Sequence, residues 1–220
     1  DKQMVDVTAM IAAITGAQSG KYNYFAEMET AGKCLDWAKN HLVRDEIVLY
    51  FHAHREFKTF EDKQKALFVY LNEKTKLLPP GANGVLFTPW LHGNRCPFED
   101  PNATAMFYGI TMETGKTDLL RALLEGTYYH IRWMLECHEK KLNIKDHIRF
   151  VGGGAISPVS CQMLADITGK KVETISKPQN VGATGAAAIV GVGLGLIKDV
   201  PSIKKYIPIL HTYVPDAKKH

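Results

Sequence analysis

The chain has 220 residues, of which 45% are hydrophobic and 23% are charged, and its formal net charge is +4. This globular composition excludes a disordered or fibrous chain, and no apolar run reaches the roughly 18 residues that a membrane-spanning helix needs. The lysines are scattered and form no basic stripe with interleaved aromatics, so we expect no nucleic-acid partner and no membrane association.

The four cysteines, Cys34, Cys96, Cys137 and Cys161, are far apart and form no Cys-x-x-Cys pair. This spacing indicates free thiols in a reducing compartment rather than a disulfide framework. We therefore expect a cytoplasmic protein. The first residue is Asp1 rather than Met, so we also expect a fragment or a trimmed chain.

In the first half of the chain, apolar residues at helical spacing predict a helix over about 29–42. A polar helical insertion is expected over about 46–78, ended by the Pro79-Pro80-Gly81 turn. A short apolar strand at 85–87 and a loop over 91–104, rich in Gly, Asn, Pro and Asp, follow.

In the second half, leucines at spacings of three and four predict a long helix over about 117–141, with Thr117 as its N-cap. The elements expected after it are a strand at 147–151, a helix at 157–168, a strand at 171–175 and a Gly/Ala-rich helix at 182–194. This alternation of strands and helices predicts an α/β fold.

The segment Phe150 to Pro158 carries three glycines between a strand and a helix, with Ser157 as N-cap and Pro158 at the first helical position. Glycines let a ligand lie against the backbone, and the amides at the start of the following helix suit a phosphate or a polar base edge. The spacing lacks the third glycine of the dinucleotide-binding fingerprint. Ligand binding and a plain tight turn therefore both remain open from the spacing alone.

Four other motifs are weaker. Five residues rather than four separate Gly109 from Gly115-Lys116-Thr117, so the P-loop spacing fails. The small residues of Gly182 to Ala188 favour close packing of a helix, by backbone or by ligand. In the loop over 91–102, Arg95 either carries function or pairs with Asp100 and holds the loop. His52 and His54 lack the ligands that would complete a zinc site.

Taken together, the motifs resemble the C-terminal domain of the FGGY family of carbohydrate kinases, and xylulokinase-like members most. The segments that carry the resemblance are FAEMETAG (25–32), PWLHGNRCP (89–97), DPNA (100–103), LLRALLEG (119–126), FVGGGAIS (150–157), QMLAD (162–166) and GATGAA (182–187). It covers about residues 5–198, so we expect a kinase domain over 1–198 and a C-terminal tail over 199–220.

The resemblance implies an actin-like, ribonuclease H-like α/β fold that forms the C-terminal half of a two-domain sugar kinase. ATP would bind in the cleft between the halves with Mg²⁺ on its phosphates. Gly153, Gly154 and Ala155 would line the adenosine pocket, with Ser157 near the base and Gln162 nearby. Gly93 matches the small residue of the family's phosphate-facing loop, and Gly182 and Ala183 would support the pocket by packing.

The family's N-terminal phosphate loop and its catalytic aspartate have no counterpart in this sequence, so we expect no catalytic residue in the chain and no kinase activity from it alone. The Glu27 to Trp37 stretch favours D-xylulose as substrate of the intact protein, with ribulose, gluconate and glycerol as alternatives. We expect homo-oligomers or pairing with the N-terminal half, because an edge strand would otherwise lie exposed.

Two rival functions stay open: a non-catalytic, nucleotide-binding or regulatory remnant of a sugar kinase, and another actin-like ATPase such as a chaperone. The loop from Pro89 to Ala103 favours the sugar kinase over the latter.

Overall fold

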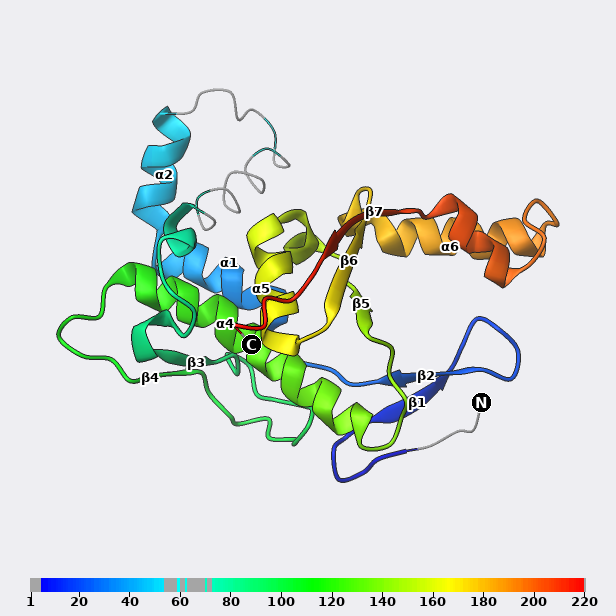
Figure 1. The fold of residues 1–220 in the computed structure, drawn as a ribbon, viewed down its shortest axis with the longest axis horizontal. Coiled ribbons are helices and arrows are strands. Elements are labelled where there is room, and N and C mark those ends of the chain that lie inside the picture. Colours follow the sequence, from blue (N-terminus) through cyan, green and yellow to red (C-terminus); the bar gives the residue numbers. More distant parts are fainter. Residues whose placement is uncertain (1–4, 54–58, 60–61, 63–69, 71–72, 220) are drawn as a thin grey trace.

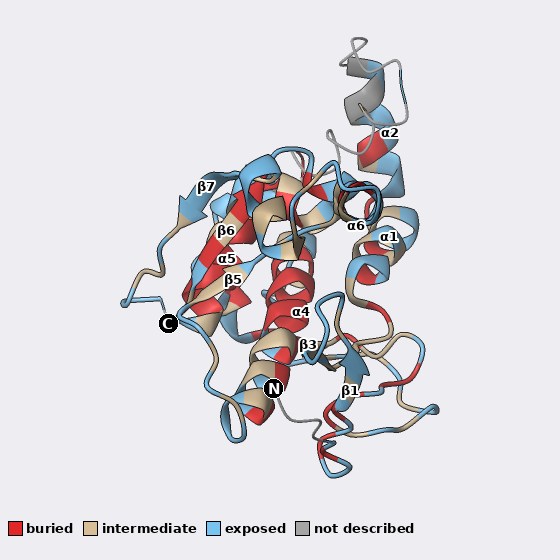
Figure 2. Cartoon of the chain, turned by 90° about the vertical axis from the view of Figure 1, so that its right-hand side faces the viewer, coloured by how far each residue is buried: buried red, intermediate tan, exposed pale blue. Residues whose placement is uncertain are grey.

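The computed structural model describes residues 5–53, 59, 62, 70 and 73–219. A 24-residue helix, α4 (Lys116–Glu139), is its central element (Figure 1). It packs against α1 (Ala31–His41), α5 (Pro158–Thr168) and the strand β3 (Leu86–Thr88). Figure 2 shows buried residues following α4 along much of its length.

Two apolar cores meet at α4. One lies between α1, β3 and α4 and includes Phe87 and Leu123. The other lies between α4, α5 and β6 and includes Tyr128 and Leu164. Because α4 contributes to both cores, it sets the position of α1 relative to the β5–α5–β6 unit.

The strands form three small sheets. β1 (Ala12–Thr15) and β2 (Tyr22–Phe25) make one antiparallel pair, and β3 makes another with β4 (Met106–Tyr108). The third sheet has the order β5-β6-β7, from β5 (His147–Arg149), β6 (Lys171–Ile175) and β7 (Ile209–Tyr213). β5 and β6 are parallel, with Ile148 opposite Val172, and β7 is antiparallel to β6.

The connection from β5 to β6 holds the glycine bend. After β5 the chain turns through η2 (Gly153–Ile156) into α5, so the bend lies between two parallel strands, as the α/β pattern predicts. The Ser157 hydroxyl accepts a hydrogen bond from the Ser160 amide at 3.1 Å, and Gly169 ends α5 in the left-handed conformation. The predicted cap, helix and stop of α5 are all confirmed.

The start of α4 differs from its prediction. The N-cap is Gly115 rather than Thr117, because the Gly115 amide donates to the Asp118 carboxylate at 2.7 Å. That carboxylate also accepts from the Asn83 side chain at 2.9 Å, which ties the helix start to η1 (Ala82–Gly84). Asp118 therefore satisfies the amide of the N-cap Gly115 without a Thr hydroxyl.

Helix α2 (Arg44–Ala53) begins the expected polar insertion, most of whose remainder lies outside the described residues. The segment expected as a tail forms η4 (Val200–Tyr206) and β7, which joins the third sheet. Over the described ranges, no helix combines the length and the apolar character that crossing a membrane requires.

Helix α6 (Val181–Gly193) does not show the close packing that its small residues predict. A Cβ at Gly182, Gly185 or Gly193 would meet no described atom within 4 Å, and only Gly191 is approached, by Ile197 Cδ1 at 3.1 Å. The helix contacts mainly η3 (Pro178–Asn180) and η4, and extends away from the sheet (Figure 1). Close approach by backbone is therefore absent at Gly182, Gly185 and Gly193 in the described chain, and close approach by a ligand stays a prediction.

Candidate nucleotide-binding site

A pocket of about 430 Å³ separates the first turns of α1 from the glycine bend. Its residues are Met28 to Lys33, Leu35 and Asp36 on one side and Gly153 and Gly154 on the other. The volume falls in the range of small-molecule sites. The pocket therefore joins two segments that are about 120 residues apart in the sequence.

The α1 side of the pocket presents a helix N-terminus. The Thr30 hydroxyl makes no capping bond, because it donates to the Pro89 carbonyl oxygen at 2.5 Å. The first amides of a helix have no partner within the helix, and those of residues 31–33, which line the pocket, are not capped by Thr30. The helix dipole and the exposed Lys33 ammonium add positive potential at the same place. This wall suits a phosphate group.

The opposite wall is bare backbone. Gly152 has φ +86° and ψ −170°, a conformation that only glycine adopts readily, and its amide donates to the Pro178 carbonyl at 2.9 Å. A Cβ on Gly154 would lie 2.8 Å from Phe150 Cζ, so a side chain there requires the Phe150 ring to move. Gly153 and Gly154 therefore present backbone without side chains to the pocket.

The predicted site residues do not all meet here. Gly153 and Gly154 line the pocket, and Ala155, which is buried, follows them in the same bend. Ser157 is 1% exposed and its hydroxyl caps α5. Gln162 faces a different pocket, where its amide donates to Asp166 at 2.7 Å and to the Val214 carbonyl at 2.8 Å.

Gly93 also lies outside this pocket. It has φ +71°, and a Cβ there would lie 2.9 Å from Pro101 Cα and from the Pro101 oxygen. Its amide donates to the Ala103 carbonyl at 3.1 Å. Glycine is therefore required at this position by the loop itself.

Arg95 does not pair with Asp100. Its guanidinium pairs with Glu27 and, at 3.5 Å, with Glu29, which lines the pocket. The loop is closed instead by two backbone hydrogen bonds between Asn94 and Asp100, at 2.9 and 3.0 Å. The alternative of an Arg95–Asp100 pair is excluded because residues 27–29, which are distant in sequence, supply the partners of Arg95.

The α1 residues of the pocket are the ones that the sequence analysis missed. The sequence placed Met28 to Asp36 only in a family segment and in a predicted helix, with no role in binding. The available signal was the order Thr30-Ala31-Gly32-Lys33, in which small residues and a cation begin a helix. Such a start is typical of anion binding, but the sequence does not show that it faces the bend.

The carboxylates of the pocket do not fit a protein-held magnesium site. Glu29 is paired with Arg95, and Asp36 accepts a bond from Lys39 at 2.8 Å. In the described part of the chain, no group of three or more His, Cys, Asp or Glu side chains is placed to hold a metal ion. His54 of the His52–His54 pair lies outside that part. Cys34, Cys96, Cys137 and Cys161 are free and buried.

Residues 1–194 match the family model for the FGGY family of carbohydrate kinases, C-terminal domain. The chain belongs to this family. It is 32% identical over 141 residues to a xylulose kinase of Staphylococcus epidermidis, a match that covers 64% of this chain and 28% of that protein. It is 27% identical over 218 residues to a glycerol kinase of Salmonella arizonae, covering 98% of this chain and 39% of that one.

A crystal structure of ligand-bound xylulose kinase from Lactobacillus acidophilus has the same fold, with a TM-score of 0.79 at 24% identity. The match covers 100% of this chain and 40% of the other. The expected fold, the C-terminal domain of an actin-like two-domain kinase, is confirmed. The FGGY chain spans well under half the length of these three relatives.

Proposed function

We propose that the intact FGGY protein is a cytoplasmic kinase that transfers the γ-phosphoryl group of ATP to a hydroxyl of a sugar or polyol, with D-xylulose as substrate. This chain would contribute the adenine-nucleotide side of the cleft. The observation that carries the proposal is the pocket between the α1 N-terminus and the Gly153–Gly154 bend. The family match and the similarity to proteins named xylulose kinase support it.

The two walls suit the two ends of a nucleotide. The uncapped amides of α1 and the Lys33 ammonium would hold phosphate oxygens, while the bare backbone at Gly153 and Gly154 would lie against the adenosine, with Ala155 behind it. Gly93, Ser157 and Gln162 stay predicted contacts of the intact protein. Phosphoryl transfer depends on positioning and charge stabilisation, which these groups can supply without covalent chemistry.

The chain itself offers no catalytic base in this proposal. The carboxylates in the pocket, Glu29 and Asp36, are each paired with a cation. The base and most sugar contacts are assigned to an N-terminal half, and closure of the two halves would exclude water from the phosphoryl group. Magnesium would arrive bound to the nucleotide phosphates.

Nucleotide binding is tested by titrating ADP into the chain in a calorimeter and comparing Gly32→Glu with Gly185→Glu. Both glycines are helical, and a Cβ at either would meet no described atom within 4 Å. Replacing glycine within a helix favours folding by up to about 1 kcal/mol. The Gly32→Glu change would nevertheless place bulk and negative charge in the phosphate site.

We expect Gly32→Glu to weaken ADP binding at least about tenfold, equivalent to about 1.4 kcal/mol, while Gly185→Glu leaves it unchanged. Thermal melts of both variants check that folding is intact. Equal ADP affinity in the two variants would contradict the proposed pocket.

Activity is tested with a coupled assay of ADP release on D-xylulose, ribulose, gluconate and glycerol. We expect no sugar-dependent turnover from this chain alone and turnover with D-xylulose from the longer protein. Turnover by the chain alone would overturn its assigned role. ATP binding without transfer in the longer protein would instead favour a non-catalytic remnant, and preference for glycerol would place it with the relatives of that name.

A further inference from the structure

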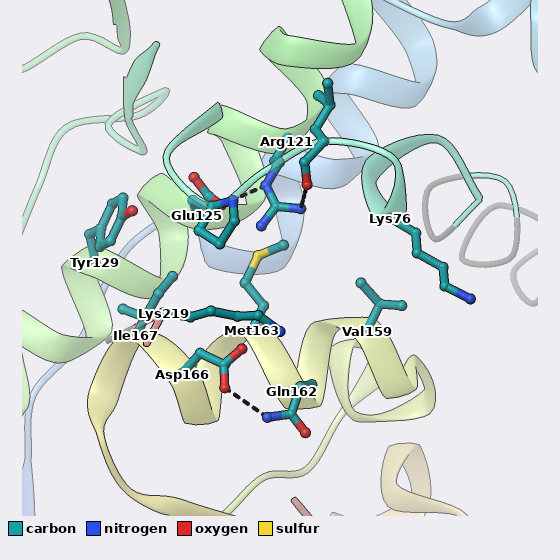
Figure 3. Close-up of a pocket in the computed structure, with 12 residues that line it drawn as sticks. Lys76, Arg121, Glu125, Tyr129, Val159, Gln162, Met163, Asp166, Ile167 and Lys219 are labelled. Atoms are coloured by element: carbon teal, nitrogen blue, oxygen red, sulfur yellow. Dashed lines mark hydrogen bonds and ion pairs between the residues drawn. The ribbon is translucent and has the colours of Figure 1, made fainter. Parts of the chain in front are cut away.

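A second pocket, of about 380 Å³, lies between α4 and α5 (Figure 3). Arg121, Glu125 and Tyr129 reach it from α4, at spacings of four residues. From α5 it takes Val159, Met163 and Ile167, again along one helix face, together with Gln162 and Asp166. It shares no lining residue with the pocket at Gly153 and Gly154.

One wall of the α4–α5 pocket is fixed by a buried ion pair. Arg121 Nε lies 2.7 Å from Glu125 Oε1, and the two side chains are 10% and 3% exposed. The Arg121 guanidinium also donates to the Thr75 and Leu78 carbonyls at 2.8 and 2.9 Å. Glu125 accepts from the Gly81 amide as well. The wall is therefore ordered without any ligand.

The acidic groups of this pocket are already satisfied. Glu125 has the partners just described, and Asp166 accepts hydrogen bonds from Gln162 Nε2 at 2.7 Å and from the Asp216 amide at 2.8 Å. A cationic ligand would have to compete with these bonds, because each carboxylate is committed to donors of the protein.

The pocket has more hydrogen-bond donors than acceptors available to a ligand. In the part of the chain that the structure describes, no carboxylate lies within ion-pair distance of Lys76, and the Tyr129 hydroxyl has no hydrogen-bond partner. The Lys219 ammonium has one contact, with Asp216 at 3.3 Å, in a half-exposed pair. Exposed pairs of this kind contribute little, so the ammonium is available to a ligand. Burial raises the pKa of Tyr129, which keeps its hydroxyl a donor.

The rest of the lining is apolar. Met163 and Ile167 are each 6% exposed, and Leu78 and Pro80 face them from the chain that precedes η1. Figure 3 shows Met163 between the Arg121–Glu125 pair and α5, with Lys76 beyond Val159 at one end and the Lys219 side chain extending across the view. A ring fits the apolar wall, and an anionic substituent fits the Lys219 ammonium beside it.

We propose that the α4–α5 pocket binds a small aromatic anion, with its ring against Met163 and Ile167 and its negative group at Lys219. The Lys219 ammonium, held only by an exposed ion pair, selects the charge, and the thioether and aliphatic wall selects the ring. The site is independent of the nucleotide pocket, so it stands whether or not the chain binds ADP.

The test uses phenyl phosphate as the probe, titrated into the ¹⁵N-labelled chain and followed by amide chemical shifts. Amide shifts at residues 31–33 and 153–154 are followed in the same titration, so that phosphate binding at α1 is distinguished from binding in the α4–α5 pocket. We expect a dissociation constant on the order of 1 mM or tighter, with shifts centred on residues 159–167 and 78–81. Benzyl alcohol, which lacks the charge, and inorganic phosphate, which lacks the ring, should each bind at least about fivefold more weakly.

Matched lysine variants test whether Lys219 binds the negative group of the ligand. Lys219→Gln should weaken phenyl phosphate binding about fivefold, whereas Lys218→Gln, which removes the same charge outside the pocket lining, should not. Val159→Trp should abolish binding by filling the pocket from the α5 side. Thermal melts confirm that each variant is folded.

Equal affinity for benzyl alcohol and phenyl phosphate, equal effects of the two lysine variants, or shifts confined to residues 31–33 and 153–154 would each overturn the proposal. Undiminished binding to a folded Val159→Trp variant would overturn it too.

Discussion

At the scale of single residues, the Arg121–Glu125 pair is the strongest polar contact to test, because removing one partner leaves a buried charge uncompensated. We expect Glu125→Leu to lower the free energy of unfolding by about 3–5 kcal/mol. Glu136→Leu breaks the Arg132–Glu136 pair, which has the same spacing on the same helix but is 40% and 50% exposed, and should cost less than about 1 kcal/mol. Urea unfolding of both variants measures the difference, and equal losses would contradict it.

At Gly152 the backbone conformation requires glycine. Its φ of +86° with ψ of −170° is open to glycine alone, so Gly152→Ala should cost about 1–3 kcal/mol of unfolding free energy even though a Cβ there meets no described atom within 4 Å. Gly182→Ala, at a helical glycine with the same open surroundings, should be neutral or stabilising. Denaturation showing the two variants to be alike would exclude backbone strain at the bend.

At the scale of elements, the loop over 89–103 is held on α4 by a buried histidine. Trp90 Nε1 donates to His130 Nδ1 at 3.3 Å, and His130 Nε2 lies 2.7 Å from the Cys96 carbonyl, to which it donates. Trp90 packs edge-on against Phe98, and Phe98 contacts Trp133. Only the neutral ring can accept from Trp90, so protonation would break this attachment.

Burial lowers the pKa of His130 below its ordinary 6.5. The unfolded chain therefore binds this proton more readily, so the stability that His130 contributes is present above pH 6.5 and is lost as the pH falls toward the folded pKa. We expect the melting temperature to drop between pH 7.5 and 5.5, with a smaller drop in His130→Phe. An identical pH dependence in both proteins would show that His130 is not responsible.

At the scale of the whole molecule, the apolar surface of α6 and its neighbours favours association. Val190, Leu194 and Leu196 are 59%, 70% and 77% exposed, and Leu210 of β7 is 59% exposed. Apolar surface of this kind marks interaction sites. We expect the chain to self-associate at high concentration or to pair with an N-terminal half, and the double variant Val190→Lys/Leu194→Lys to shift it toward monomer. Gel filtration that gives a clean monomer at all concentrations would contradict this.

An element could be predicted from the sequence where its own residues carry the capping, stop or periodicity signals that define it. α5 was predicted with its Ser157 cap and its Gly169 stop because both act within one turn of the helix. β7 was not predicted, since its burial pattern shows no alternation and its four residue pairs with β6 define it as a strand. The β1–β2 pair was missed as well, because its two strands are four residues long and are defined by their pairing with each other.

The sequence by itself determined the family, the order of strand, bend and helix around Gly153, and the need for glycine in that bend. Only the tertiary structure decided that the uncapped start of α1 faces the bend. It also decided the pairing of Arg95 with Glu27 and Glu29 and the position of Gln162 in the α4–α5 pocket. Caps, turns and helix periodicity are set by neighbours within a few residues. The pocket instead joins segments about 120 residues apart, whose relative position depends on the two cores that α4 shares.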